Sequence, residues 1–405
     1  MCEGDGMEEW KECKLGDICK TNINSYSEKD NWSFVNYLDT GNITENKISD
    51  IQFIDLSSES LPSRARRKVQ INDIIYSTVR PNQKHFGIIK NQPENFLVST
   101  GFAVLHINKT IADPNFIFYN LIQNENTESL HAIAEQTTSA YPAIKPSDIE
   151  NLSIKLPPLP TQQKIVAILS SLDDKIELNN KISTNLEQQA QALFKNWFVD
   201  FEPFGGKMPE GWKVGKLSEY CNFQEGYVNP AQTHNEYFDG DVKWLRAVDI
   251  NESFILNTSR TLTKCGFESA GKSAFLFKPG SIAISKSGTV GRLGIISDFM
   301  CGNRAVIGIE LKEQQNLSYI HQYLKSRQTE FPDMAVGSVQ KNLYVSILEN
   351  LDIIIPSKEV LEKFAAICIP FYDQIKTNCV ENNNLSSIRD ILLPKLMNGE
   401  IGVLK

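Results

Sequence analysis

Two segments of the chain carry apolar residues at alternating spacings of four and three. The first segment gives the positions Ile165, Leu169, Leu172, Ile176, Asn179, Ser183, Leu186, Ala190, Leu193 and Trp197. The second gives Phe364, Cys368, Phe371, Ile375, Asn378, Asn382, Leu385, Arg389, Leu392 and Leu396. This spacing is typical of the seam of a coiled coil. We therefore predict two long helices that pack against each other in antiparallel orientation.

Four residues add detail to the predicted helices. Thr161 follows the rigid segment PPLP at 157–160 and is suited to be the N-cap of the first helix. Pro394 should end or kink the second helix, because proline lacks the backbone N–H that a helix interior needs. Asn179 and Asn378 occupy the same position in the middle of their seams. A buried Asn in a coiled coil fixes the register at some cost in stability.

The remaining segments mix strand-like and helix-like patterns. Runs rich in β-branched and aromatic residues predict strands within 71–79, 96–107, 281–285 and 305–311. The segments 116–124 and 319–327 predict short helices. We therefore expect an α+β protein in which each globular part mixes helices with strands.

The two halves of the chain resemble each other. The segment IENLSIKLP at 149–157 recurs as LENLDIIIP at 348–356, an offset of 348 − 149 = 199. The same offset pairs Asn179 with Asn378 without a gap. Such self-similarity indicates a tandem duplication. We predict a first globular domain at 1–156, a central helical region at 157–204, a second globular domain at 205–355 and a C-terminal helical region at 356–405.

The composition is that of a globular protein, with 41% hydrophobic and 22% charged residues. No apolar stretch approaches the roughly 18 residues that a membrane-spanning helix needs. The polar N-terminal segment does not have the pattern of a secretory signal. The eight cysteines include no C-x-x-C pair, which disfavours a zinc ribbon. We expect a cytoplasmic protein with reduced thiols, no metal site and no membrane association.

The charge distribution is uneven. The chain has 41 Lys and Arg against 49 Asp and Glu, a net charge of −8, which excludes indiscriminate coating of nucleic acid. Two basic islands nevertheless stand out. Residues 64–90 hold seven basic residues against one acidic residue, and residues 260–304 hold seven against two. Each island is either a solvated surface or a nucleic-acid contact.

Sequence patterns that suggest catalysis are weak. Residues 266–273 (GFESAGKS) satisfy the phosphate-loop pattern, but Pro279-Gly280 leaves no room for the helix that must follow. Residues 113–116 (DPNF) are one residue away from an amino-methyltransferase motif and fit a helix start better. The five histidines are scattered and form no metal-ligand or nucleophile pattern. We interpret these matches as coincidental and predict no catalytic residues.

Five motifs together resemble the specificity subunit of Type I restriction–modification systems, over nearly the whole chain. They are LPSRARRKV at 61–69, YSTVRPNQKHFG at 76–87, SAYPAI at 139–144, LPPLPTQQKI at 156–165 and LLPKLMNGEI at 392–401. The resemblance implies two target-recognition domains, each reading one half of a split site in double-stranded DNA. It implies two methylation subunits and restriction (translocase) subunits as partners. S-adenosylmethionine, ATP and Mg²⁺ would bind to those partners, so that this chain holds no cofactor.

The basic islands supply residue types suited to DNA. Arg and Lys bind phosphates, Arg can donate two hydrogen bonds to guanine, and Asn and Gln suit adenine. The residues that we expect at DNA are Arg64, Arg66, Arg67, Lys68, Arg80, Asn82, Gln83, Lys84, His85, Tyr141, Lys286, Ser287, Thr289, Arg292, Arg304, Gln340 and Lys341. About 35 helical residues span roughly 50 Å, or about 15 base pairs, a length suited to a site in two parts.

Two other functions remain as alternatives. The chain could be a helical scaffold that joins partner subunits without reading DNA. It could also be an NTP-hydrolysing enzyme built on residues 266–273.

Overall fold

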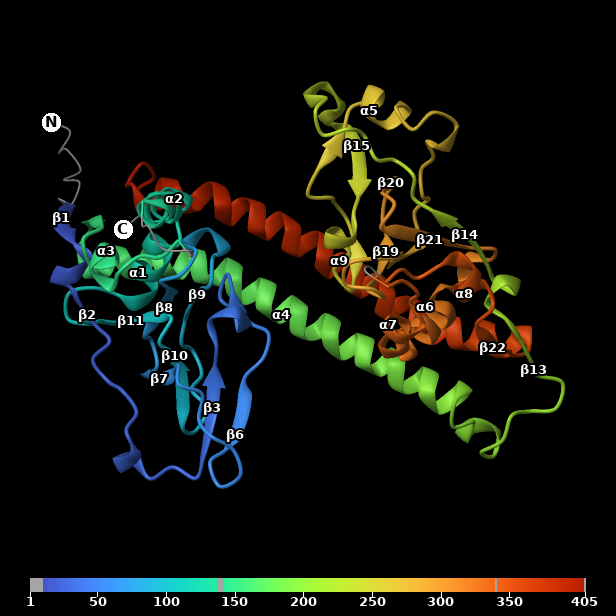
Figure 1. Cartoon of the computed structure of the whole chain (residues 1–405), viewed down its shortest axis with the longest axis horizontal. Helices are drawn as coiled ribbons and strands as arrows, with labels where there is room; N and C mark the ends of the chain where they lie inside the picture. Colours follow the sequence, from blue (N-terminus) through green and yellow to red (C-terminus); the bar gives the residue numbers. More distant parts are fainter. Residues whose placement is uncertain (1–9, 137–141, 339–340, 404–405) are drawn as a thin grey trace, which may run out of the picture. The chain divides into compact units, whose positions relative to one another are not determined.

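The computed structural model describes residues 10–136, 142–338 and 341–403. The chain forms two compact units, and each contains one strand-rich domain together with part of both long helices (Figure 1). Unit 1 comprises Met1–Asp174 and Ser386–Lys405, and unit 2 comprises Lys175–Leu385.

The two long helices are α4 (Leu159–Phe198) and α9 (Lys358–Met397), each of 40 residues. The predicted seams are confirmed, because none of the twenty seam positions is exposed. The predicted N-cap of the first helix is wrong, and Pro394 does not end the second helix. Helix α4 begins at Leu159, since Pro160 lies in the first turn, where no backbone N–H is needed, so Thr161 is inside the helix. Helix α9 continues past Pro394 to Met397.

A hydrophobic cluster compensates for the missing N–H of Pro394. Its neighbours Leu393, Leu396 and Met397 are all buried in the main core of unit 1. They pack there with Ile165 and Leu169 of α4. The burial of these side chains outweighs one lost hydrogen bond in the final turn.

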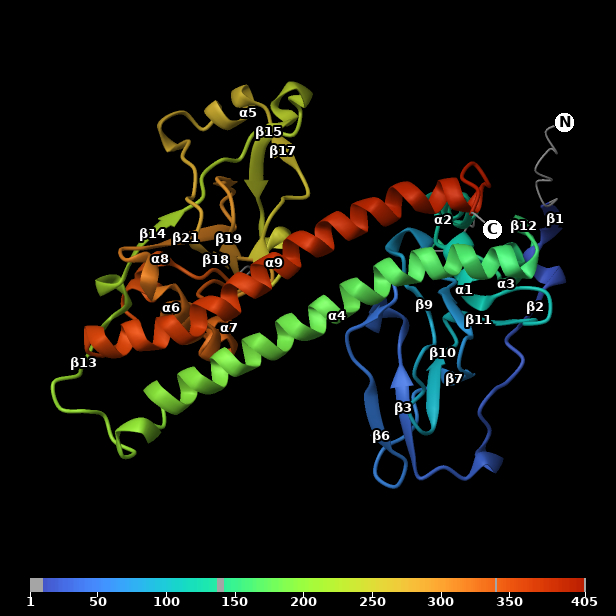
Figure 2. The same cartoon turned by 180° about the vertical axis from the view of Figure 1, so that it is seen from behind.

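In unit 2 the helices pack in antiparallel orientation around a buried polar layer (Figure 2). Asn378 Nδ2 donates to the Asn179 carbonyl at 3.3 Å and to Ser183 Oγ at 3.0 Å. Asn179 Nδ2 donates to Glu381 Oε2 at 2.8 Å and Asn382 Oδ1 at 2.9 Å. Both Asn179 and Asn378 are at most 2% exposed. Both residues are therefore buried in the seam, as their positions predicted, and they also contact each other.

The residues at positions 173 and 372, which differ by the repeat offset, bind the helix of their own recognition domain. In unit 1, Tyr119 of α1 (Pro114–Leu121) donates to Asp173 Oδ2 at 2.6 Å, and Arg389 donates to Asp173 Oδ1 at 2.9 Å. In unit 2, His321 Nδ1 of α6 (Leu317–Ser326) lies 2.8 Å from the Tyr372 hydroxyl. Both halves of the repeat therefore have a contact between a long helix and the helix of the domain, although different residue types form it.

The strand-rich domain of unit 1 contains two four-stranded sheets, ordered β6–β3–β10–β7 and β2–β11–β8–β9. Its strands are β1 (Lys11–Lys14), β2 (Cys19–Thr21), β3 (Phe34–Leu38), β4 (Ile43–Thr44), β5 (Lys47–Ile48), β6 (Gln52–Asp55), β7 (Ala65–Lys68), β8 (Ile74–Ser77), β9 (Phe86–Ile88), β10 (Phe96–Ser99), β11 (Phe102–Ile107) and β12 (Ser153–Leu156). Its other helices are α2 (Asn124–Glu135) and α3 (Pro146–Glu150).

The domain of unit 2 contains a five-stranded sheet, β14–β21–β18–β19–β16, and a three-stranded sheet, β17–β15–β20. Its strands are β13 (Lys213–Lys216), β14 (Cys221–Glu225), β15 (Phe238–Leu245), β16 (Phe254–Ile255), β17 (Thr261–Leu262), β18 (Ile282–Ser285), β19 (Leu293–Ile296), β20 (Cys301–Gly302), β21 (Val306–Leu311) and β22 (Asp352–Ile355). Its other helices are α5 (Lys264–Glu268), α7 (Phe331–Met334) and α8 (Val345–Glu349).

The two domains repeat one topology. The order β2–β11–β8–β9 in unit 1 corresponds to β14–β21–β18–β19 in unit 2, with the same antiparallel pairings. In each domain the first strand also pairs with the last, β1 with β12 and β13 with β22. In each domain, therefore, the chain enters and leaves at two strands that lie side by side.

The expected strands lie inside the predicted segments, with one difference. The segment 96–107 forms two strands, β10 and β11, rather than one long strand. Gly101 lies between them, where a Cβ atom would come within 2.8 Å of the Thr40 side chain. A residue without a side chain fits this close contact.

Two negative findings concern the described residues. None of their helices combines the length and the apolar character needed to cross a membrane. All seven cysteines in these ranges are free thiols.

Candidate nucleic-acid interface

Three segments meet beside the β8–β9 loop in unit 1, and we call this arrangement junction 1 (residues 78–80, 99–101 and 142–144). Thr78 donates its N–H to the Gly101 carbonyl at 2.8 Å, and Arg80 donates its N–H to the Pro142 carbonyl at 2.9 Å. Thr100 N–H in turn donates to the Arg64 carbonyl at 2.8 Å. Two predicted DNA-contacting residues, Arg64 and Arg80, are thereby brought to the same junction from different strands.

The corresponding loop in unit 2 forms the same arrangement, junction 2 (residues 285–286, 303–305 and 342–343). Lys286 N–H donates to the Ala305 carbonyl at 2.7 Å, and Leu343 N–H donates to the Lys286 carbonyl at 2.9 Å. Junction 2 brings Lys286 and Arg304 together, and Lys341 lies next to it in the sequence. Lys286 has the backbone position that Thr78 has in junction 1, so the two junctions share their hydrogen bonds but not the positions of their basic residues.

The β8–β9 loop of unit 1 is held rigidly. Arg80 and Lys84 both adopt left-handed backbone conformations, with φ of 49° and 56°, on either side of a short helical turn at Pro81–Gln83. Pro81 is buried, whereas Asn82 and Gln83 are exposed. The loop thus presents two amide side chains to solvent on a fixed backbone.

Two other residues of this loop bind within the chain. Lys84 Nζ lies 3.1 Å from Glu45 Oε1. His85 Nδ1 lies 2.6 Å from the Ile43 carbonyl, to which it donates. Both residues therefore stabilise the loop. The charge of Lys84 is partly neutralised by this ion pair, which the sequence alone does not show.

The β18–β19 loop of unit 2 is smaller, and its backbone changes direction at two glycines. Gly288 and Gly291 have φ of 77° and 90°, which other residues rarely adopt. Ser285 Oγ accepts the Arg292 N–H at 2.8 Å and closes the loop. Thr289 is exposed at its tip, and Ser287 and Arg292 are partly exposed.

Lys286 is less available than the sequence indicates. Its Nζ lies 2.8 Å from Glu225 Oε2, and both side chains are less than 20% exposed. The same ammonium lies 5.2 Å from the centre of the Tyr344 ring. Lys286 therefore fixes the base of junction 2.

The basic residues of β7 lie at the edge of the sheet β6–β3–β10–β7. Lys68 forms an ion pair with Asp30 and lies over the Trp32 ring. Burial lowers the pKa of the Arg67 guanidinium. Arg66 is partly exposed. Two predicted contacts, Tyr141 and Gln340, lie outside the described residues.

Arginines without an ion pair gather in the recognition domains. Within the described ranges, the structure records no carboxylate partner for Arg66, Arg67, Arg260, Arg292 and Arg304, whereas Arg64 interacts electrostatically with Asp39. By contrast, Arg389, which lies on the long helix α9, pairs with a carboxylate. Arg327, which directly follows α6, also pairs with a carboxylate. An acidic chain that leaves these arginines unpaired has positive groups available for an anionic partner.

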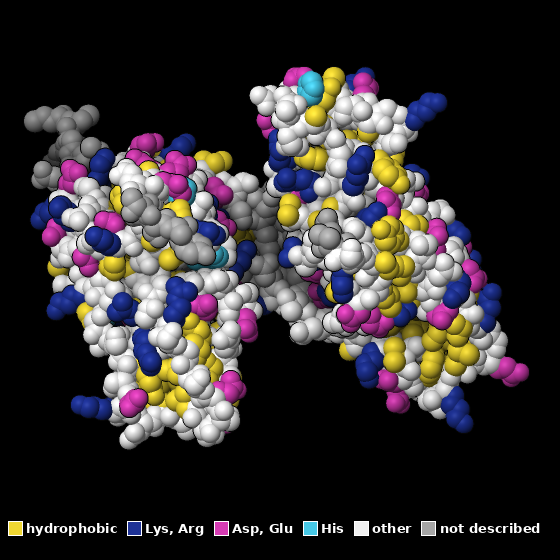
Figure 3. All heavy atoms as spheres, in the orientation of Figure 1, with side chains coloured by type: hydrophobic (Ala, Val, Ile, Leu, Met, Phe, Trp, Pro, Cys, Tyr) yellow, Lys and Arg dark blue, Asp and Glu magenta, His cyan; other side chains and the backbone are white. Residues whose placement is uncertain are grey.

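The visible surface carries basic and acidic side chains interspersed over both units (Figure 3). Unit 1 also shows a hydrophobic patch on this face (Figure 3). Among its exposed apolar residues is Phe53 on β6, which is 64% exposed and stacked on Phe34 with ring centres 5.4 Å apart. The mixed distribution agrees with the net charge of −8. The face seen in this view does not carry a large basic patch.

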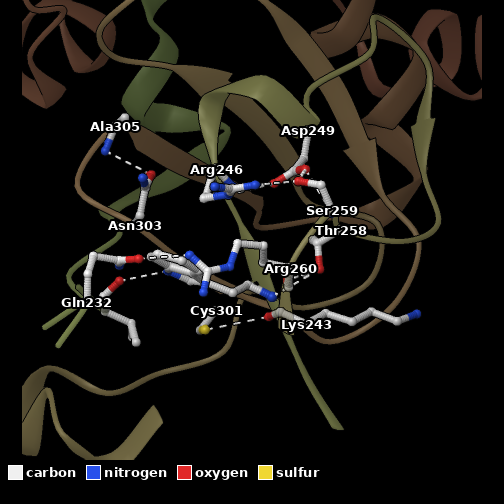
Figure 4. Close-up of polar contacts among 12 residues, drawn as sticks. Gln232, Lys243, Arg246, Asp249, Thr258, Ser259, Arg260, Cys301, Asn303 and Ala305 are labelled. Atoms are coloured by element: carbon white, nitrogen blue, oxygen red, sulfur yellow. Dashed lines mark hydrogen bonds and ion pairs between the residues drawn. The ribbon is translucent and has the colours of Figure 1, made fainter. Parts of the chain in front are cut away.

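Sequence reasoning missed a second set of polar residues, next to junction 2. Arg246 follows β15, Arg260 precedes β17, and Gln232 lies in the loop before β15 (Figure 4). Arg260 Nη1 donates to Gln232 Oε1 at 2.8 Å. These residues are 14 or 28 positions apart, so only the pairing of β15 with β17 brings them together.

The phosphate-loop pattern does not form a phosphate-binding loop. Its first residues belong to α5, and Gly271–Ser273 form a short helical turn. A Cβ atom at Gly266 would lie 2.2 Å from the Tyr237 carbonyl oxygen, so protein backbone occupies the space that a phosphate would need. The sequence match is therefore a coincidence, as we predicted.

Within the described residues, no group of three His, Cys, Asp or Glu side chains is arranged to hold a metal ion. His321 is fully buried, and burial lowers its pKa to about 3, so it is neutral near pH 7. A tiny cavity of about 10 Å³ beside His321 and Tyr372 has room for little more than one water molecule.

Comparison with known proteins identifies the family. The family described as "Type I restriction modification DNA specificity domain" matches residues 7–188 and, a second time, residues 209–386. The chain belongs to this family. The two matches correspond to the two halves of the repeat, so the chain carries two target-recognition domains.

Individual relatives agree with the family match. The chain is 31% identical to the Type I restriction enzyme HindI specificity subunit of Haemophilus influenzae, over 98% of this chain and all of that protein. It is 29% identical to the MjaIX specificity subunit of Methanocaldococcus jannaschii, over 71% of this chain and 69% of that one. The crystal structure of a Type I S subunit from M. genitalium has the same fold, with a TM-score of 0.55, 14% identity and 98% of both chains covered.

Proposed function

We propose that the chain reads a split site in double-stranded DNA, one half with each recognition domain, and carries the subunits that modify and cleave DNA. The chain then supplies sequence recognition only. Methyl transfer from S-adenosylmethionine belongs to two methylation subunits, and ATP-driven translocation and cleavage belong to restriction subunits. S-adenosylmethionine, ATP and Mg²⁺ bind to those partners.

One observation carries this proposal: the same junction occurs in both domains and holds basic residues in both. Junction 1 presents Arg64 and Arg80, and junction 2 presents Arg304 with Lys286 at its base. A duplicated arrangement of this kind suits two similar ligands, such as the two halves of one DNA site. Phosphate contacts would orient each domain, and exposed side chains such as Asn82 and Gln83 would read bases.

The long helices support the second part of the proposal, the docking of partners. In unit 2, apolar side chains on α4 and α9 remain exposed, among them Leu178 at 51%, Ile182 at 38% and Ile369 at 47%. In unit 1 the same is true of Ile168 at 39% and Ile391 at 59%. Apolar groups that recur along the outside of a helix pair suit further helices from a partner.

The test is reconstitution of the complex. The purified chain is mixed with S-adenosylmethionine and DNA, first alone and then with its methylation subunits. We expect methylated DNA only in the second mixture. Sequencing of the modified bases should show one site in two specific parts, separated by a fixed number of unspecified base pairs.

Two results would contradict the proposal. Methyl transfer by the chain alone, free of other subunits, would make it an enzyme. A complex that assembles but methylates without sequence preference would leave the chain as a scaffold, the alternative that does not read DNA.

A further inference from the structure

In unit 2, Arg246 follows β15 and Arg260 precedes β17. The side chains of these two arginines make different kinds of contact. Arg246 Nη2 donates to Ser259 Oγ at 2.6 Å, and Asp249 Oδ2 accepts the Arg246 N–H at 2.9 Å. Asp249 Oδ1 also accepts the Ser259 N–H at 2.9 Å. Arg246 and Asp249 together fasten the segment before β17 to the end of β15.

The backbone of Arg260, the residue after Ser259, is held by Thr258. Thr258 Oγ1 donates to the Arg260 carbonyl at 2.8 Å and accepts the Trp244 N–H at 3.2 Å. The residues on both sides of Ser259 are therefore fixed to β15 (Figure 4). The main chain that carries Arg260 has little freedom to move.

The side chain of Arg260 is held as well. Its guanidinium carbon lies 4.1 Å from the centre of the Phe238 ring, in a cation–π contact. Its Nη1 donates to Gln232 Oε1 at 2.8 Å. Ordering a flexible arginine costs side-chain entropy, and here the fold has ordered the side chain before any ligand binds.

Arg260 nevertheless keeps unused donors. A guanidinium has five N–H groups, of which the structure uses one with Gln232. Within the described residues no carboxylate pairs with Arg260, whereas Asp249 lies beside Arg246. The Arg260 side chain is partly exposed at the surface of the domain.

We propose that Arg260 is a specificity-determining residue that reads a guanine in the half-site of the second recognition domain. A planar guanidinium fixed in orientation can donate to O6 and N7 of one guanine at once, and this contact distinguishes guanine from the other bases. Phe238 and Gln232 are positioning residues, and Arg246 holds the segment that carries Arg260. The inference rests on the proposed function.

The experiment uses the assembled methylation complex. The two-part site is first determined for the unmodified chain by sequencing methylated DNA. Affinity is then measured for duplexes that carry each single base-pair change in that site. The variants are Arg260→Ala, Arg260→Lys and Gln232→Ala, with Lys213→Ala on β13 as a control that removes one positive charge from the same domain.

We expect both Arg260 variants to lose discrimination at one G·C base pair of one half-site, by about 5- to 150-fold, while the other half-site is unchanged. Lysine keeps the charge but not the planar pair of donors, so it should not restore discrimination. Gln232→Ala should weaken discrimination at the same base pair, and Lys213→Ala should leave it intact. Arg260→Lys preserves the stacked cation, so the comparison remains possible if the alanine variant unfolds.

Two outcomes would overturn the inference. In the first, Arg260→Ala lowers affinity equally for all duplexes and Arg260→Lys restores it, which is the behaviour of a phosphate contact. In the second, neither variant changes any base preference. Both results are compatible with a two-part site read by the unmodified chain, so they reject the role of Arg260 without rejecting the proposed function.

Discussion

At the scale of single residues, Arg80 combines a basic side chain with a backbone held in a left-handed conformation. Its N–H is fixed to Pro142, and the turn Pro81–Gln83 follows it directly. A rigid backbone restricts the region of space that this side chain can reach. Lys84, four residues later, already lies beside Glu45.

We predict that Arg80→Ala weakens DNA binding by the assembled complex and that Lys84→Ala does so less. If Arg80 contacts phosphate, the loss is equal across sequences and the salt dependence falls by about one counterion. If it contacts a base, the loss is about 1–3 kcal/mol and confined to one position. Binding titrations at several salt concentrations measure both.

The control for this prediction is Lys155→Ala on β12, an exposed lysine away from junction 1. It should alter neither affinity nor salt dependence. Unchanged binding in the Arg80 and Lys84 variants alike would remove this loop from the interface.

His321 gives a prediction on pH. Its pKa in the folded chain is about 3 because of burial, whereas an unfolded histidine titrates near 6.5. Below pH 6.5 the unfolded chain therefore binds a proton that the folded chain does not bind. Through His321, the free energy of unfolding should fall by about 1.4 kcal/mol for each pH unit between pH 6.5 and about 3, and His321 should have no effect on it above this window.

Urea unfolding between pH 4.5 and 8 tests this contribution. The variant His321→Asn keeps a polar group near Tyr372 but does not titrate, so unit 2 should lose part of its acid sensitivity. His234→Asn, at an exposed position, should behave like the unmodified chain. Parallel pH profiles for the unmodified chain and His321→Asn would contradict the prediction.

Among single residues, the sequence predicted candidates for DNA contact but not the partners that surround each side chain. Arg64, Arg80 and Arg304 were predicted as DNA-contacting residues, and the structure brings them to the junctions. Arg260 was counted in a basic island but not chosen, because its neighbours Gln232 and Phe238 come from distant positions. A sequence pattern does not show which strands pair, so it does not show which arginine is oriented.

At the scale of elements, the helix pair was the most predictable feature, since its spacing of four and three is a local property of the chain. The ends of these helices were predicted less well. Helix α4 includes Pro160 and Thr161, and α9 continues through Pro394. Packing of Leu393 and Leu396 in the unit 1 core decided the second case, and tertiary packing is not visible in a local pattern.

The buried polar layer gives a prediction at this scale. Asn378→Ala removes the donors to Ser183 Oγ and the Asn179 carbonyl and leaves those acceptors buried. We expect a loss of about 1–3 kcal/mol in the free energy of unfolding, measured by urea titration.

Two further variants separate the polar layer from general helix effects. Asn384→Ala, on the exposed side of the same helix, should change stability by less than about 0.5 kcal/mol. The double variant Asn179→Leu/Asn378→Leu should be less destabilised than Asn378→Ala, because neither buried amide remains. Equal stability of Asn378→Ala and the unmodified chain would show that the layer contributes nothing.

At the scale of the whole molecule, each recognition domain is a segment whose two ends are paired. Lys11 lies opposite Leu156 in the β1–β12 pair, and Lys213 lies opposite Ile355 in the β13–β22 pair. The chain between the paired strands can change while the strands themselves remain. Domain exchange should therefore preserve the rest of the molecule.

We predict that exchanging residues 15–152 for the matching segment of a relative changes one half of the recognised DNA site and leaves the other half intact. Sequencing of methylated DNA from cells that express the chimera measures this. Exchanging residues 217–351 of the second domain instead should change only the other half of the DNA site. A change in both halves after one exchange would show that the domains do not read DNA independently.

The packing of the chain's last residues in unit 1 has a consequence for synthesis. Leu393, Leu396 and Met397 complete a core whose other members, such as Ile165 and Leu169, emerge from the ribosome more than 200 residues earlier. At about 5–20 residues per second, that core stays open for roughly 10–50 s during translation. Premature termination near residue 385 would therefore leave the first-made domain unfinished, although the later-made unit 2 would have all of its residues. Nascent unit 1 is the part of this protein that we expect to need protection by chaperones.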